Sequence, residues 1–278
     1  MKRTIVNFAL STGILVISLT GCRKDENQET TTGIDNGIAE THFNDLYSVV
    51  NNSAADNGFA GFTAPDNSAN KTSSSDCPTV TFSEPFGTFP NTMTIDFGTG
   101  CTGYFGVERS GKVIATFTGL YMSEGTVITV VPEDYYVNGV HIEGTKTVTN
   151  LGLNDAGNMY FSVVVADAVI TLTDGSDIEY NSTREREWVE GSSTADIHDD
   201  VYSITGSSAG INRLDIPFAM SITEALRKEM DCHWIVSGKV EITPEGEETR
   251  TIDYGEGECD NEAILTVGSF TITITLPF

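Results

Sequence analysis

From residue 77 to the end of the chain, hydrophobic and polar side chains alternate, with Thr, Val, Ile, Phe and Tyr prominent. In the last stretch every second residue is apolar and threonines stand between them: Phe270, Ile272, Ile274, Leu276 and Phe278. Alternate residues of a strand point to opposite faces, so this pattern predicts strands with one buried and one solvated face. Such strands are typical of antiparallel sheets.

Three dipeptides with glycine indicate where strands end and reverse: Ser110-Gly111, Asn138-Gly139 and Asp174-Gly175. Asn-Gly is the strongest short signal for a two-residue hairpin with a type I′ turn. The fold class predicted for the chain is therefore all-β, either an antiparallel sandwich-like structure or a single large twisted sheet, with one short N-terminal helix.

Helical patterns are scarce. Residues 22–76 are rich in Asn, Ser, Thr, Gly and Asp, a composition that predicts a polar tether without a core of its own. Within it, the apolar residues of 36–51 fall near helical spacing, so we expect a short amphipathic helix there. A second helix or turn is expected at 221–230, where Ser221 and Glu224 have the spacing of a capping box.

The N-terminus has the features of a cleaved signal peptide. Met1, Lys2 and Arg3 form a short positive head, and a short, interrupted apolar stretch follows at 5–19. A membrane-spanning helix needs about 20 apolar residues, so the stretch is too short to remain as an anchor. It ends in Leu-Thr-Gly-Cys at 19–22, which resembles the lipobox of bacterial lipoproteins. That resemblance implies cleavage after residue 21 and acyl chains, palmitate among them, on Cys22.

Lys24-Asp25-Glu26 follows directly and resembles the export signal of surface lipoproteins in Bacteroidota-type bacteria. Together with the Thr-rich β pattern, it makes the chain similar to the Thr-rich all-β surface lipoproteins of those bacteria. The resemblance implies an outer-membrane lipoprotein exposed at the cell surface, but it implies nothing about an activity. A solvated charged tether is the other reading of the same three residues.

Charge narrows the choice of partners. The chain has 15 basic and 40 acidic residues, and loss of Lys2 and Arg3 with the signal peptide leaves 13 basic residues and a formal charge of −27. Such a charge repels nucleic acid and anionic lipid surfaces, so we expect no nucleic-acid partner. The membrane is expected as a partner through the lipid alone. No nucleotide-binding, zinc-protease or serine-hydrolase motif occurs, and we expect no cofactor.

Four cysteines remain after Cys22: Cys77, Cys101, Cys232 and Cys259. An even number in an oxidising compartment predicts two disulfides, for which three connectivities exist. TIDFGTGC at 94–101 returns as TIDYGEGEC at 251–259, and each copy follows another cysteine. This repeat favours Cys77 with Cys101 and Cys232 with Cys259. The domains are then a signal peptide (1–21), a tether (22–76) and an antiparallel β domain (77–278) with related disulfide modules at 77–101 and 232–259.

One strand pattern carries an enzyme hypothesis. Glu185, Glu187 and Glu190 superficially resemble the Glu-x-Asp-x-x-Glu strand of laminarinase-type glycoside hydrolases. The resemblance implies Glu185 as nucleophile, Glu187 as its helper and Glu190 as acid/base, because two carboxyl groups must flank the glycosidic bond. Here Glu187 replaces the central Asp and arginines intervene. The alternative is a solvated or edge strand with cations on one face, anions on the other and cross-strand ion pairs.

Two polar loops are weaker candidates for metal binding. The first is the segment 253–262, with the oxygen ligands that calcium prefers but without EF-hand spacing: Asp253, Glu256, Glu258, Asp260 and Glu262. The second mixes an imidazole with carboxylates: Asp196, His198, Asp199 and Asp200. Solvated hairpin ends are the plainer reading of both loops.

The function expected from these observations is a non-catalytic surface module that binds a glycan or a protein. Tyr135, Tyr136 and Trp188 are candidate contact residues, although for each a place in the core is the more common role. The alternatives are a glycoside hydrolase that uses the Glu185 strand and a structural envelope component.

Overall fold

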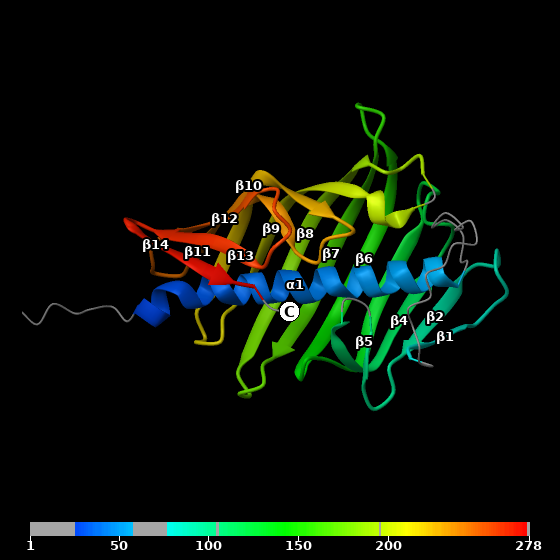
Figure 1. The fold of residues 1–278 in the computed structure, drawn as a ribbon, viewed down its shortest axis with the longest axis horizontal. Coiled ribbons are helices and arrows are strands. Elements are labelled where there is room, and N and C mark those ends of the chain that lie inside the picture. Colours follow the sequence, from blue (N-terminus) through cyan, green and yellow to red (C-terminus); the bar gives the residue numbers. More distant parts are fainter. Residues whose placement is uncertain (1–25, 58–76, 104–105, 195, 277–278) are drawn as a thin grey trace, which may run out of the picture.

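The computed structural model describes residues 26–57, 77–103, 106–194 and 196–276. These residues form one antiparallel sheet of 14 strands and an N-terminal helix, α1, which lies across the strands (Figure 1). Thirteen strands follow one another in sequence order from β1 to β14, and the short β3 pairs with β4 beside this path. The predicted all-β class is confirmed, in the form of a single large sheet.

The elements have the following bounds: α1 (Glu26–Asp56), β1 (Thr79–Phe82), β2 (Asn91–Asp96), β3 (Cys101–Thr102), β4 (Glu108–Phe117), β5 (Val127–Val137), β6 (Val140–Leu153), β7 (Met159–Thr171), β8 (Asp177–Glu190), η2, a 3₁₀ helix (Ile197–Asp199), β9 (Val201–Ile211), β10 (Pro217–Glu229), β11 (Ile235–Pro244), β12 (Arg250–Glu256), β13 (Glu262–Val267) and β14 (Phe270–Thr275).

Helix α1 is the centre of the molecule. It has 31 residues, and every residue from Thr30 to Ala55 is buried or partly buried, because the sheet curls around it. Its first half packs closely on the last strands, where a Cβ added to Gly33 would lie 2.2 Å from a Leu265 methyl. The prediction of a polar tether is therefore wrong for 26–56, and the helix extends beyond 36–51 at both ends. Residues 22–25 and 58–76 lie outside the described part of the chain.

Bulges give the sheet its curl. The strand registers shift in several neighbouring pairs, among them β4 with β5, β6 with β7 and β10 with β11. An extra residue in one strand bends it and increases the local twist. Ser110-Gly111 lies at such a shift inside β4, so the prediction of a turn there is wrong. Asn138-Gly139 does join two strands, β5 and β6, and both residues have positive φ, as a type I′ turn requires.

Residues 221–230 are not helical. They belong almost entirely to β10, which pairs with β9 on one side and β11 on the other. Two ladders of backbone hydrogen bonds outweigh a local capping pattern. The helix-like spacing falls where the register shifts between Ser221 and Leu226, so it coincides with a bulge.

Two disulfides join Cys77 to Cys101 and Cys232 to Cys259, as the sequence repeat favours. The first ties the segment just before β1 to β3, and the second ties the β10–β11 loop to the β12–β13 loop. No helix among the described residues has the length and hydropathy that a bilayer crossing requires.

Candidate functional site

The interface between α1 and the sheet is polar, and among the described residues three ion pairs cross it. Asp45 accepts hydrogen bonds from Nε and Nη2 of Arg109 on β4, and both side chains are fully buried. Glu40 accepts hydrogen bonds from Arg184 on β8 and from the Tyr180 hydroxyl, each at 2.8 Å.

The third pair lies near the start of the helix. Asp35 accepts hydrogen bonds from the backbone N–H and Nε of Arg213, in the β9–β10 turn, at 2.9 and 2.7 Å. Around it, Asn212 donates to the Thr32 hydroxyl and Ser208 donates to the Asn36 side chain. These polar side chains of the helix, which would not favour a helix on its own, thus form hydrogen bonds with polar residues of the sheet.

The spacing of the three acids explains why the helix lacks an amphipathic stripe. Asp35, Glu40 and Asp45 are five residues apart, and each step of five turns the side chain by about 140° around the helix axis. The three carboxylates therefore point in three different directions, and each finds an arginine because the sheet curls around the helix.

A small cavity of about 30 Å³ lies between α1 and the inner face of β6–β10. Its wall contains four basic side chains and one acidic one: Lys146, Arg184, Arg186, Lys228 and Glu40. Burial alone would raise the pKa of Glu40, but Arg184 outweighs burial and holds the pKa below its usual value. Burial lowers the pKa of Lys146 to about 7 and that of Lys228 to about 8. The wall thus has more basic than acidic side chains in a strongly acidic protein, and burial weakens the charge of its two lysines.

Aromatic rings surround Arg186. Its guanidinium carbon lies 3.9 Å from the Tyr47 ring centre and 4.6 Å from that of Tyr202, and Nη2 donates to the Tyr121 hydroxyl. The Tyr121 hydroxyl is in turn 3.0 Å from that of Tyr47. Burial raises the pKa of Tyr121 and Tyr202 above the usual value, so these phenols stay neutral. Ring faces and neutral hydroxyls stabilise this cation where a carboxylate would be expected.

The three glutamates of the enzyme hypothesis do not converge in a cleft. Glu185 is exposed on the outer face of β8, and Glu187 on the same face accepts hydrogen bonds from the amides of Asn154 and Asn158. Glu190 pairs with Arg227 at 3.0 Å. The inner face belongs to the arginines, and α1 fills the concavity. The three glutamates therefore do not form the active site that the glycoside hydrolase hypothesis requires.

The expected separation of cations and anions on β8 is present, but β8 is a central strand and its cationic face is buried. Arg184 and Arg186 lie inward and bind groups of the helix layer, whereas Glu185 lies outward. The predicted solvated or edge strand is therefore wrong. The helix supplies the anion, Glu40, which sequence spacing within the sheet cannot reveal.

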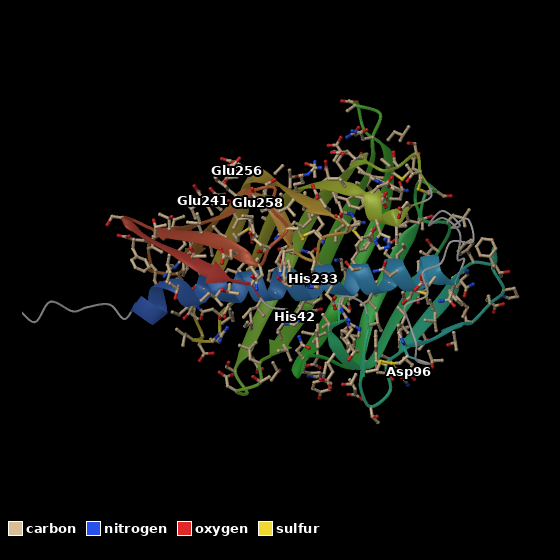
Figure 2. The ribbon with its side chains drawn as sticks, viewed as in Figure 1. His42, Asp96, His233, Glu241, Glu256 and Glu258 are labelled. Carbon is tan, nitrogen blue, oxygen red and sulfur yellow. A yellow bond between two sulfur atoms is a disulfide. The ribbon has the colours of Figure 1, made fainter. Side chains whose placement is uncertain are left out.

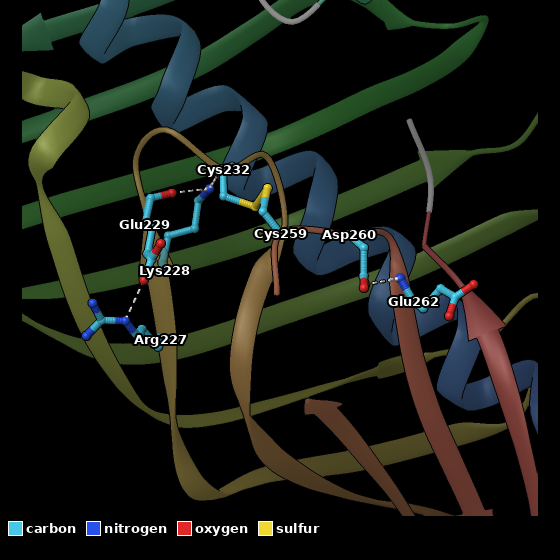
Figure 3. The surroundings of a disulfide bond; sticks show 7 residues. All are labelled: Arg227, Lys228, Glu229, Cys232, Cys259, Asp260 and Glu262. Carbon is cyan, nitrogen blue, oxygen red and sulfur yellow. Dashed lines mark hydrogen bonds and ion pairs between the residues drawn. A yellow bond between two sulfur atoms is a disulfide. The ribbon is translucent and has the colours of Figure 1, made fainter. Parts of the chain in front are cut away.

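The acidic segment 253–262 forms turns. Glu256 and Glu258 lie at the outer edge of the sheet, away from α1 (Figure 2). Asp253 pairs with Lys239 at 3.5 Å, and Asp260 accepts a hydrogen bond from the backbone N–H of Glu262 beside the Cys232–Cys259 disulfide (Figure 3). In the described part of the chain, no three or more His, Cys, Asp or Glu residues are grouped to hold a metal ion.

The second candidate loop is also structural. Asp196 caps η2 by accepting a hydrogen bond from the backbone N–H of His198, and Asp199 accepts one from the Thr194 hydroxyl. Asp200 is buried and accepts a hydrogen bond from Nε1 of Trp188 at 3.1 Å. Burial and the neighbouring Asp199 raise the pKa of Asp200 to about 7.

Of the three aromatic contact candidates, Tyr135 and Trp188 belong to the core, while Tyr136 is 39% exposed and stacks on His141.

The lipidation candidate, Cys22, lies outside the described residues. No family model, curated protein or solved structure matches the chain.

Proposed function

We propose that the chain is a lipid-anchored, non-catalytic binding or interaction module displayed at the outer membrane surface. The lipobox at 19–22 and Lys24-Asp25-Glu26 support the anchor and the location. The observation that carries the binding role is the position of α1: the helix fills the concave face of the sheet, so a glycan or protein partner would meet the outer face or the loops.

The start of α1 sets how the body is held. Only residues 23–25 separate Cys22 from Glu26, the first residue of the helix, and four Cα–Cα steps span at most about 14 Å. The lipid would thus be linked to a helix that runs through the core. Gly33 and Gly37 of this helix pack against Leu265 of β13 and Leu276 just after β14. In this proposal, that end of the body lies next to the membrane.

The anchor is tested on the full-length chain expressed in a bacterium with a lipoprotein pathway. The wild type is expected in the membrane fraction, with residues 1–21 removed and a mass increase from acyl chains on Cys22. The variant Cys22→Ser should keep the signal peptide and gain no acyl mass. A cleaved wild-type chain without lipid in the soluble fraction would overturn the anchor.

The binding role is tested separately by screening the mature chain on glycan arrays. The screen must use a chain that includes 26–56, because the sheet alone would lack its central helix. Exposed residues of the outer face are then substituted, and array positions without glycan serve as the control for unspecific binding. Variants that still bind the glycan would contradict a site on that face. Cleavage of the bound glycan would contradict the non-catalytic role.

A further inference from the structure

The cavity beside Tyr47 has properties that the proposed function does not use. It lies between the middle of α1 and the inner face of the central strands, and its volume of about 30 Å³ is sufficient for about two water molecules. This volume suits a small molecule or ion.

The cavity wall has more basic than acidic side chains. Among the described residues, Glu40 pairs with Arg184, but no carboxylate lies within ion-pair distance of Arg186, Lys146 or Lys228. Lys146 donates to the Phe43 carbonyl, and Lys228 donates to the carbonyls of Glu229 and Cys232. Burying the Arg186 guanidinium without a counter-ion costs several kcal/mol, whereas burial lowers the pKa of each lysine and so weakens its charge.

Hydrogen-bond donors on the same wall are also unused. Nε and Nη1 of Arg184 and Nε of Arg186 are buried and have no partner among the described residues. Both arginines are more than nine-tenths buried, and both line the cavity. Each buried donor left without an acceptor costs about 1–3 kcal/mol.

We infer that this cavity binds one small anion, of the size of chloride or formate, with the guanidinium groups of Arg184 and Arg186 as its principal donors. Water would satisfy the N–H groups but would leave the excess positive charge in place. An anion does both. Arginine presents its donors in a rigid planar fork that suits such ligands. The inference does not depend on the lipid anchor.

The first test is thermal unfolding of the full-length mature protein in sodium chloride or sodium formate. Sodium gluconate, whose anion is too large for the cavity, keeps the ionic strength constant. We expect a saturable rise of the melting temperature, about 5 °C at an anion concentration one hundred times the dissociation constant. Equal melting temperatures in gluconate, chloride and formate would overturn the inference.

Two variants localise the effect. Arg186→Gln removes a cation of the cavity wall, and we expect it to lose the anion-dependent rise. Lys112→Gln removes an exposed cation paired with Glu133 and should keep the full rise. If both variants retain it, the anion binds elsewhere and the inference fails.

A third measurement covers the case in which Arg186→Gln does not fold. Crystals of the wild type grown in sodium bromide should show an anomalous peak within hydrogen-bond distance of both guanidinium groups. A cavity without this peak, holding water only, would contradict the inference. A peak without any effect of bromide on the melting temperature would mean an adventitious ion only, which would also overturn it.

Discussion

The guanidinium carbon of Arg186, on the central strand β8, lies 3.9 Å from the centre of the Tyr47 ring on helix α1. The contact joins the sheet to the helix next to the basic cavity. It depends on the planar shape of the guanidinium group, which stacks on a ring face as an ammonium group does not.

Arg186→Lys should therefore destabilise the protein although the charge is kept. We expect a loss of about 1–2 kcal/mol in the free energy of unfolding, measured by urea denaturation, because the stacking on Tyr47 and the bond to Tyr121 are lost. Arg227→Lys is the control, since Arg227 forms partly exposed pairs and should lose under about 1 kcal/mol. Equal effects of the two substitutions would contradict the stacking role.

Asp45→Ala should be among the most damaging single substitutions. It removes the carboxylate that pairs with Arg109 and leaves the fully buried guanidinium without this anion, for which we expect a loss of about 3–5 kcal/mol. Glu133→Ala breaks the exposed pair with Lys112 and should cost under about 1 kcal/mol. Urea midpoints of the two variants test this, and similar midpoints would show that the helix does not depend on the pair.

Gly206 tests the curl of the sheet. Its φ is +126°, and an added Cβ would lie 2.3 Å from the Thr183 carbonyl oxygen on the neighbouring strand. Gly206→Ala should cost well over the roughly 1 kcal/mol of a positive φ alone. Gly175→Ala isolates that smaller cost, because Gly175 has a φ of +85° and open space around it. A thermal melt in which both variants lose the same stability would mean that strand proximity at Gly206 is unimportant.

Buried histidines predict a loss of stability in mild acid. Burial lowers the pKa of His42, on α1, and of His233, in the β10–β11 loop, to about 4, and the charge of His233 lowers the pKa of His42 further (Figure 2). Between pH 6.5 and 4 the unfolded chain binds protons that the folded chain does not, so stability falls as the pH falls. Each histidine contributes on the order of 3 kcal/mol over this window.

His42→Gln should therefore make stability less dependent on pH between 6.5 and 4, whatever its effect at pH 7. His198→Gln is the control, because His198 is exposed in η2. Urea unfolding at several pH values gives the slopes. A slope for His42→Gln as steep as that of the wild type would contradict the assignment.

The strands and both disulfides could be predicted from the sequence, because alternation and a repeated cysteine motif are local signals. The helix could be predicted only at 36–51, where apolar residues such as Phe43 and Leu46 have helical spacing. Its first turns are polar and would be disordered alone. They are ordered by Arg213, Asn212 and the neighbouring strands, which are more than 150 residues away in the chain.

The basic cavity could not be predicted from spacing either, because its wall comes from a helix and several strands. One signal was present in the sequence, namely the positions of the few basic residues. The chain has 15 basic residues against 40 acidic ones, yet the described buried residues include six basic and four acidic side chains. This protein gains its solubility from acidic residues. Basic residues at alternate positions of a strand, such as Arg184 and Arg186, therefore indicate side chains that face the interior.

The central claim is that α1 forms the core of the body rather than a loose tether, and hydrogen exchange of the mature protein followed by mass spectrometry tests it most directly. Peptides from 30–55 should exchange as slowly as those of β7 and β8, because the helix opens only when the sheet opens. Complete exchange of these peptides within seconds, while β7 and β8 remain protected, would contradict the claim.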